Sequence, residues 1–275
     1  MSSRPIQAAA VSAAVREAAD LLQGAIDTGN PCLPVRDFFS FGDVEAAYSV
    51  QRLNTERAVA EGRRLAGRKI GLTSPTVQRQ LGVAQPDFGA LFTDMAVADG
   101  GLVPVQRLLQ PKVEAEVALV LTDDLPNPSC TVAELVRATG FAVAALEIVD
   151  SRIAAWDISI VDTVADNASS GLFVLGGTRV TLDRVDLRSV RMTLSRHGTV
   201  VSEGSGADCL GSPLNAALWL ASTLARRGDP LRAGDVVLTG ALGPMVAAAP
   251  GDVFHAELSG LGSVRVVFAA EGESL

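Results

Sequence analysis

The feature that most limits the fold is a series of short strand-like runs after residue 100. Such runs occupy 190–195 and 199–202, on either side of the His197-Gly198 turn, and then 235–239, 253–258 and 263–269. Strands outnumber helices here, and strict alternation of strand and helix is missing. The sequence therefore predicts a mixed, strand-rich α+β domain rather than a doubly wound parallel sheet.

Helical periodicity dominates the residues before this region. The apolar residues that recur at helical spacing before Gly29 are Val11, Val15, Ala18, Leu22 and Ile26. A second helix is expected from Asp43 to about Gly62. Later helices are predicted from the start signals Ser74-Pro75, Thr131 with Glu134, and Ser212-Pro213, with ends near Gly82, Gly140 and Gly228. We therefore expect a helical N-terminal region at 1–65 and a second domain at 66–275.

Composition excludes several classes of partner. The 275 residues are 48% hydrophobic, yet no run approaches the roughly 18 apolar residues of a membrane helix. No targeting segment is recognised, so a cytoplasmic location is expected. A net charge of -8 and 4% aromatic residues argue against nucleic acid or an anionic membrane as a partner.

The three cysteines, Cys32, Cys130 and Cys209, are odd in number and far apart. This pattern predicts small buried side chains rather than disulfides or a zinc site.

The segment QPKVEAEVALVL at 110–121 places two carboxylates in an otherwise apolar run. If 112–121 is a strand, Val113 and every second residue after it face the core, while Lys112, Glu114 and Glu116 share the other face. Burying the carboxylates unpaired would cost several kcal/mol each, so they need a cation. A solvated strand face with a Lys-Glu pair is the alternative for this segment taken alone.

A third carboxylate favours a metal site. Glu147 is the lone charge in the apolar part of FAVAALEIVDSR at 141–152, in a predicted strand. Three carboxylates from neighbouring strands, with no histidine or cysteine nearby, suit a hard cation such as Mg²⁺ or Mn²⁺ and disfavour zinc.

Other candidate catalytic groups are few. The chain has two lysines, Lys69 and Lys112, among 23 basic residues. An ammonium can exchange protons where a guanidinium cannot, so a retained lysine suggests chemistry, although compositional drift explains it equally well. His197, in a turn, and His255 are interpreted as surface residues. No nucleophile elbow and no complete dinucleotide fingerprint is found, so acid–base chemistry falls to carboxylates, a lysine and the metal.

Four segments carry a resemblance to a known family: 67–95 (GRKIGLTSPTVQRQLGVAQPDFGALFTDM), 110–121, 145–170 (ALEIVDSRIAAWDISIVDTVADNASS) and 238–246 (LTGALGPMV). Together they are similar to the 2-keto-4-pentenoate hydratase family, in the hydratase/decarboxylase branch of the fumarylacetoacetase-like superfamily. The resemblance implies a mixed β-roll of the fumarylacetoacetase C-terminal type at 66–275, as the catalytic domain, with a helical N-terminal region. It also implies a homo-oligomer.

The resemblance implies roles for particular residues. The implied ligands of a divalent cation, Mg²⁺ or Mn²⁺, are Glu114, Glu116 and Glu147. The implied catalytic residues are Lys69 and Asp87, and the residues expected to bind substrate are Ser169, Thr239 and Gly240. Thr239 and Gly240 are expected in a turn that closes the pocket. Members of the family often have arginine where Lys112 stands, so Lys112 receives no catalytic role.

The implied reaction adds water to 2-hydroxypenta-2,4-dienoate, or a close homologue, to give 4-hydroxy-2-oxopentanoate in the catabolism of aromatic meta-cleavage products. One alternative is 4-oxalocrotonate decarboxylase, disfavoured by the aspartate of QPDFG and by the residues of TGALGPM. Another is an acylpyruvate hydrolase, which would need a histidine–carboxylate pair. A non-enzymatic scaffold or ligand-binding subunit would not need Lys69, Asp87 and three buried carboxylates together.

Overall fold

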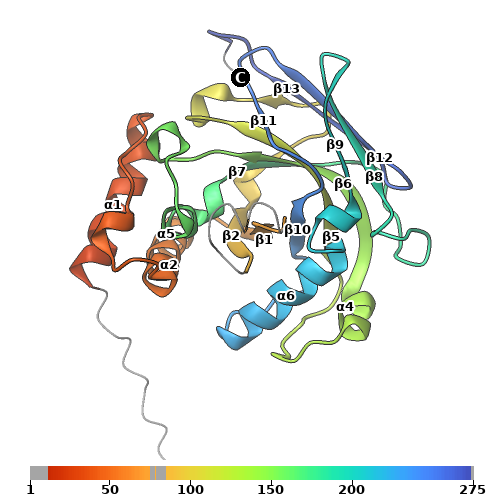
Figure 1. Ribbon diagram of the computed structural model, residues 1–275, viewed down its shortest axis with the longest axis horizontal. Helices are drawn as coiled ribbons and strands as arrows, with labels where there is room; N and C mark the ends of the chain where they lie inside the picture. The colour runs from red at the N-terminus through yellow and green to blue at the C-terminus, as the bar shows by residue number, and fades with distance from the viewer. Residues whose placement is uncertain (1–11, 75–77, 79–84, 274–275) are drawn as a thin grey trace, which may run out of the picture.

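The structure is a computed structural model that describes residues 12–74, 78 and 85–273 (Figure 1). Two helices precede the first strand, and strands then predominate. The helices are α1 (Ala13–Thr28), α2 (Val44–Ala60), α4 (Val132–Ala138), α5 (Ile160–Ala165) and α6 (Pro213–Arg226). The strands up to residue 175 are β1 (Leu65–Gly71), β2 (Asp87–Phe92), β3 (Ala96–Val97), β4 (Leu102–Val103), β5 (Lys112–Leu121), β6 (Thr139–Val149) and β7 (Ser170–Leu175). The later strands are β8 (Arg191–Arg196), β9 (Thr199–Ser205), β10 (Val236–Ala241), β11 (Val246–Ala247), β12 (Val253–Leu258) and β13 (Gly262–Phe268).

Helices α1, α2, α4 and α6 lie where the sequence predicts them, within about two residues at their ends, whereas α5 was not predicted. Ser12 caps α1 by accepting a hydrogen bond from the Val15 N–H group, and Gly29 ends this helix in the left-handed conformation. Thr131 and Glu134 form the predicted capping box of α4, and Pro213 stands in the first turn of α6. The helix predicted from Ser74-Pro75 to Gly82 lies outside the described residues.

A large curled sheet forms the centre of the fold. Its strand order is β2-β1-β10-β5-β6-β7-β3, and β11 also pairs with β5. The β1–β10 and β3–β7 pairs are parallel, and the others are antiparallel. Helices α1 and α2 pack together on one side, next to α5, and α6 packs against β10 and β1 (Figure 1).

A second sheet, of order β4-β13-β12-β8-β9, packs on β6 and β7. The side chains between the layers form one continuous core, in which Phe254, Phe268, Leu146 and Ile148 are at most 1% exposed. The α+β fold class predicted from the sequence is confirmed. None of the described helices is long and apolar enough to cross a membrane.

Candidate active site

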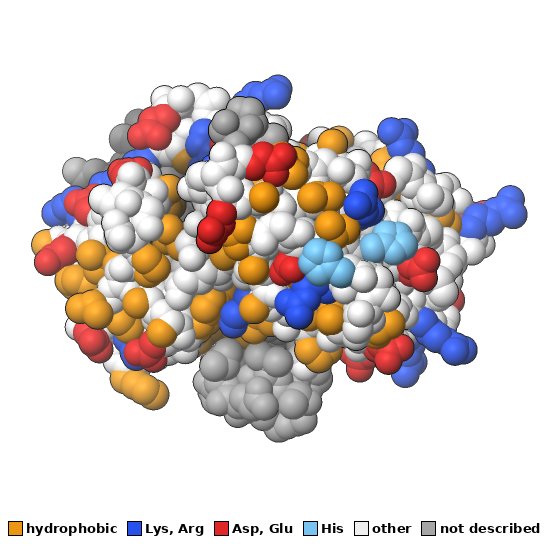
Figure 2. Space-filling model, turned by 90° about the horizontal axis from the view of Figure 1, so that it is seen from above, with side chains coloured by type: hydrophobic (Ala, Val, Ile, Leu, Met, Phe, Trp, Pro, Cys, Tyr) orange, Lys and Arg blue, Asp and Glu red, His pale blue; other side chains and the backbone are white. Residues whose placement is uncertain are grey.

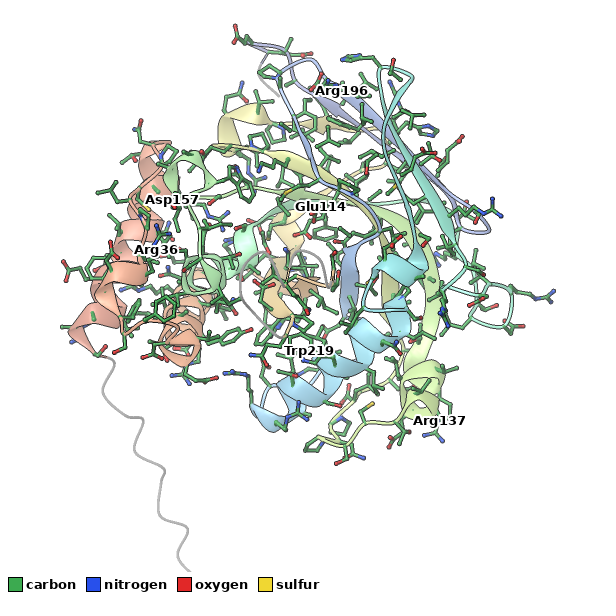
Figure 3. The ribbon with its side chains drawn as sticks, in the orientation of Figure 1. Arg36, Glu114, Arg137, Asp157, Arg196 and Trp219 are labelled. Carbon is green, nitrogen blue, oxygen red and sulfur yellow. The ribbon has the colours of Figure 1, made fainter. Side chains whose placement is uncertain are left out.

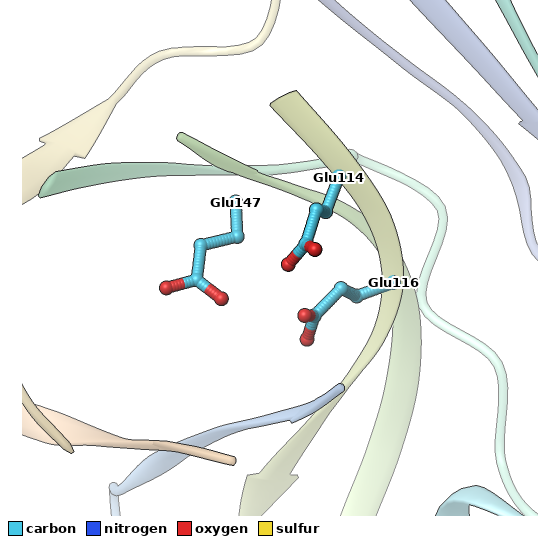
Figure 4. A group of neighbouring side chains, drawn as sticks. All are labelled: Glu114, Glu116 and Glu147. Atoms are coloured by element: carbon cyan, nitrogen blue, oxygen red, sulfur yellow. The ribbon is translucent and has the colours of Figure 1, made fainter. Parts of the chain in front are cut away.

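Strands β5 and β6 bring three carboxylates to one face of the large sheet. Glu114 lies opposite Glu147 in the antiparallel ladder, and Glu116 follows two residues later on β5, so its side chain projects to the same face. One oxygen from each carboxylate lies within 4.8 Å of the others (Figure 4). Figure 3 shows Glu114 near the centre of the molecule. The structure thus brings together the three glutamates that the sequence singled out.

Burial makes this cluster electrostatically unfavourable. Glu116 and Glu147 are at most 1% exposed, and Glu114 is half-buried. Burial raises the pKa of all three carboxyl groups, that of Glu114 to about 7, and the charge of Glu147 raises the pKa of Glu114 and Glu116 further. Glu116 Oε1 and both oxygens of Glu147 accept no well-directed hydrogen bond from the described residues. The cluster therefore needs positive charge to be stable when ionised.

The donor set fits a hard divalent cation. All three groups offer carboxylate oxygens, and no described histidine or cysteine joins the cluster. Oxygen ligands of this kind suit Mg²⁺ or Mn²⁺, and the buried oxygens without hydrogen-bond partners are the atoms free to coordinate. Glu114, Glu116 and Glu147 are the residues that could hold such an ion.

Lys69 supplies the nearest protein cation. It lies on β1, is 3% exposed, and its Nζ lies 3.1 Å from Glu147 Oε1. Since the Glu147 oxygens accept no well-directed hydrogen bond, this contact is an ion pair. Burial by itself would lower the pKa of Lys69, but Glu147 and the neighbouring carboxylates outweigh it and raise that pKa. The ammonium also donates a hydrogen bond to Ala168 O at 2.8 Å. Lys112 plays no such part, because its Nζ lies over the Trp156 ring, 4.0 Å from the centroid.

Asp87 begins β2 and lies opposite Gly71 in the β1–β2 ladder. Its side chain is buried, and burial raises its pKa, while the charge of Lys69 and a hydrogen bond from the Thr163 side chain act in the opposite direction. Oδ1 accepts no hydrogen bond from a described residue. This oxygen packs so closely on Gly71 that a Cβ atom there would lie 2.2 Å from it. Asp87 is therefore buried under the charge of Lys69, with one oxygen that accepts no well-directed hydrogen bond from the described residues.

Ser169 lies in a left-handed turn between α5 and β7. Asn167, Ala168 and Ser169 have φ values of 53°, 52° and 53°, in a region that non-glycine residues seldom adopt. Ser169 Oγ lies 3.4 Å from Thr163 Oγ1. Backbone strain of this kind costs about 1–3 kcal/mol per residue and is concentrated at functional sites. Sequence reasoning selected Ser169 and missed Asn167 and Thr163; an asparagine before Ala-Ser-Ser is a weak signal for a left-handed residue.

The turn predicted in the segment TGALGP begins later than expected, because Thr239 and Gly240 lie within β10 and the bend follows at 242–243. The ladder between β10 and β5 is irregular between Leu238 and Ala241, and the irregularity turns the Gly240 N–H group towards Glu116 Oε2, 2.8 Å away. Thr239 Oγ1 donates to Val117 O at 2.8 Å. Gly240 thus supports a carboxylate of the cluster, and the Thr239 hydroxyl is engaged with the backbone.

The histidines lie outside this arrangement, and one cysteine borders it, because Cys209 Sγ donates a hydrogen bond to Thr239 O at 2.9 Å. His197 is exposed and His255 is half-buried, so both reach the surface as predicted, and Figure 2 shows their side chains on one face of the molecule. His197 Nε2 lies 3.0 Å from Asp252 Oδ1, a contact that the sequence did not indicate. The cysteines are free, with Cys130 and Cys209 buried as expected and Cys32 half-buried.

Comparison with known proteins places this geometry in a family. The family described as fumarylacetoacetate (FAA) hydrolase C-terminal matches residues 68–269. The chain is 59% identical over 252 residues to 2-keto-4-pentenoate hydratase 2 of Dechloromonas aromatica, covering 92% of this chain and 96% of that protein. It is also 59% identical over 256 residues to the TodF product hydratase of Pseudomonas putida, covering 93% and 96%.

A solved structure has the same fold over nearly its whole length. It is 4-oxalocrotonate decarboxylase from Pseudomonas putida G7, complexed with magnesium and adipate. The TM-score is 0.88 at 35% sequence identity, and the match covers 92% of this chain and 97% of that one.

Proposed function

The chain belongs to the fumarylacetoacetate hydrolase C-terminal family, and from this premise we propose that it is a metal-dependent hydro-lyase. Its substrate is 2-hydroxypenta-2,4-dienoate or a close homologue, and its product is 4-hydroxy-2-oxopentanoate or the matching homologue. The observation that carries this proposal is the convergence of Glu114, Glu116 and Glu147 beside Lys69. The 59% identity to two proteins named as hydratases supports the reaction class.

Glu114, Glu116 and Glu147 would hold Mg²⁺ or Mn²⁺ through carboxylate oxygens. When bound, the cation supplies Lewis-acid stabilisation of negative charge that develops on the substrate's C2 oxygen. The substrate carries a carboxylate next to this oxygen, so it presents two oxygens to the same positive charge. The buried glutamate oxygens that accept no well-directed hydrogen bond from the described residues support this arrangement.

Lys69 and Asp87 would move the protons. The substrate first becomes a 2-oxo-3-enoate as the C2 hydroxyl loses its proton and C5 gains one. Water then adds its hydroxyl group to C4, and C3 receives a proton. Asp87 would accept the proton of the water, a role supported by its Oδ1, which accepts no well-directed hydrogen bond from the described residues. Lys69 would steady the enolate and deliver a proton, and the surrounding carboxylates, which raise its pKa, support a protonated ammonium there.

Ser169, Thr239 and Gly240 would contribute to the substrate site in different ways. Ser169 presents its hydroxyl near Thr163. Gly240 acts through Glu116, and Thr239 bonds the β5 backbone, so their contribution is to hold the site in shape.

The second candidate function is decarboxylation of 4-oxalocrotonate. The structural match at a TM-score of 0.88 favours it, because the two chains share their fold at 35% identity. The higher identity to named hydratases and the buried Asp87 favour hydration.

Activity assays on the purified chain distinguish these functions. The substrates are 2-hydroxypenta-2,4-dienoate and 4-oxalocrotonate, and each is assayed after EDTA treatment and again after Mg²⁺ or Mn²⁺ is restored. The proposal expects metal-dependent formation of 4-hydroxy-2-oxopentanoate, identified by mass spectrometry, and no release of CO₂ from 4-oxalocrotonate. Rapid release of CO₂ without hydration would establish the second candidate. Hydration that persists in EDTA would remove the metal from the mechanism.

We also propose that residues 1–65 form a helical region that acts together with a catalytic domain at 66–275. The protein is further proposed to be a cytoplasmic homo-oligomer that has no nucleic acid or membrane partner. Gln51 on α2 supports the joint action of the two regions, because its Nε2 donates hydrogen bonds to Phe88 O and Val164 O at 2.8 and 2.9 Å. The homo-oligomer rests on the resemblance to the hydratase family. Light scattering on the purified chain tests the oligomeric state.

A further inference from the structure

The left-handed turn at 167–169 needs an external constraint. A positive φ is unusual for any residue other than glycine, and here three consecutive residues adopt it. The turn connects α5, which carries Thr163, to β7. Such a conformation persists where surrounding contacts determine it, so the contacts that hold the turn should matter to the site.

The side chain of Asn167 provides this constraint. Its Oδ1 accepts a hydrogen bond from the Ala90 N–H group at 2.7 Å, and its Nδ2 donates to Ala90 O at 2.9 Å. Because β2 is the edge strand of the large sheet, these two backbone groups have no neighbouring strand on that side. The amide of Asn167 therefore takes the place of a ladder partner and fastens the turn to β2.

The contact between the turn and β2 is close. A Cβ atom at Gly89 would lie 2.3 Å from Asn167 O and 2.9 Å from Ser170 Oγ. A side chain at position 89 would therefore push the turn away from the strand. Gly89 and the Asn167 amide together fix the distance between the turn and β2.

This position aims a backbone carbonyl at Lys69. Ala168 O accepts a hydrogen bond from Lys69 Nζ at 2.8 Å, and the same Nζ lies 3.1 Å from Glu147 Oε1. Lys69 lies opposite Gly89 in the β1–β2 ladder, so the turn reaches the ammonium across the glycine. The direction of the remaining N–H groups of Lys69 thus depends on where the turn holds Ala168 O.

We propose that Asn167 is a positioning residue, whose amide clamps the left-handed turn onto β2 so that Ala168 O orients the Lys69 ammonium for proton transfer. The inference rests on the proposed function for the catalytic role of Lys69. It assigns Asn167 no contact with substrate or metal.

Two substitutions separate the clamp from the backbone conformation. Asn167→Ala removes the amide and keeps the strain, whereas Asn167→Gly removes the amide and adopts positive φ without strain. Both should lower kcat by about 10²-fold, the scale of a misplaced catalytic group, with KM and the calorimetric Kd for Mg²⁺ little changed. The unfolding temperature should fall more for Asn167→Ala than for Asn167→Gly. Ala155→Gly, which relieves positive φ at a turn outside the site, is the matched control and should keep kcat.

Chemical reactivity of Lys69 gives a readout that does not depend on turnover. The chain has two lysines, so reductive methylation followed by peptide mass spectrometry compares the methylation rate of Lys69 with that of Lys112 in the same molecule. Lys69 should be protected in the wild type, and its rate relative to Lys112 should rise several-fold in both Asn167 variants. An Asn167→Gly enzyme with kcat within about twofold of wild type, or unchanged Lys69 reactivity in both variants, would overturn the clamp. If the wild type hydrated no dienoate, the proposed function would fall, while the reactivity comparison would still decide the clamp.

Discussion

Glu114 and Glu147 form a cross-strand pair of like charges in the β5–β6 ladder, with Glu116 beside them. Like charges at directly opposite positions destabilise a sheet, and burial increases the cost. The sheet therefore holds an arrangement that favours binding of a cation over the stability of the metal-free protein.

Metal binding should stabilise the protein measurably. At free Mg²⁺ or Mn²⁺ of about 100 times Kd, the free energy of unfolding should rise by about 2.7 kcal/mol, because the ion binds the folded cluster. Thermal unfolding with metal and with EDTA measures the difference. Glu116→Gln should abolish it, since an amide oxygen can still accept from Gly240 N–H but carries no charge. The exposed Glu203→Gln is the control and should retain the full difference.

Each ligand should be needed for turnover. Glu114→Gln, Glu116→Gln and Glu147→Gln should each lose metal-dependent activity, because an amide poorly replaces an anionic ligand of a hard cation. Activity assays across a metal titration, paired with metal analysis of the purified variants, test this. A variant with full activity and unchanged metal content would take that residue out of the site.

The ammonium of Lys69 should be needed as an acid. Lys69→Arg keeps a charge but not a titratable group, so kcat should fall by roughly 10²-fold or more. Lys112→Arg is a matched control, because an arginine can also lie over the Trp156 ring, and its kcat should stay within about twofold of wild type. A near wild-type rate for Lys69→Arg would reduce Lys69 to a fixed positive charge.

Asp87 should act at water addition. Asp87→Asn removes the base and leaves the carboxylate cluster intact, so formation of 4-hydroxy-2-oxopentanoate should fall by roughly 10²-fold or more. Ketonisation, followed as deuterium uptake from solvent at C5, should persist. Equal loss of uptake and hydration would place Asp87 before the addition of water.

Thiol reactivity should be low and should rise with pH. Burial raises the pKa of Cys32 to about 11 and that of Cys209 to about 12, which depletes the nucleophilic thiolate at neutral pH. Iodoacetamide labelling of the native protein at pH 8 should therefore be slow, and that of Cys32 should accelerate about tenfold per pH unit up to its pKa. Complete labelling in guanidinium chloride is the control, and fast native labelling of Cys32 at pH 8 would contradict the shift.

Local signals in the sequence were sufficient for four of the described helices, for most of the longer strands after residue 110 and for the carboxylate cluster, but not for α5 or β7. The capping residue Thr131 marks a helix start through bonds to Glu134, three positions away, so this signal is visible without the fold. The cluster was predictable because side chains alternate along a strand, and Glu116 and Glu147 are charges in runs that are otherwise apolar.

Tertiary structure decided what neutralises and supports that cluster. Lys69 reaches Glu147 because β1 pairs in parallel with β10, which pairs in turn with β5, an order that periodicity along the chain does not encode. The left-handed turn at Asn167 and the strand conformation of Gly240 depend on hydrogen bonds to Ala90 and Glu116, far away in sequence. Local propensity disfavours positive φ at Asn167, Ala168 and Ser169, so this conformation exists because long-range contacts outweigh the local preference.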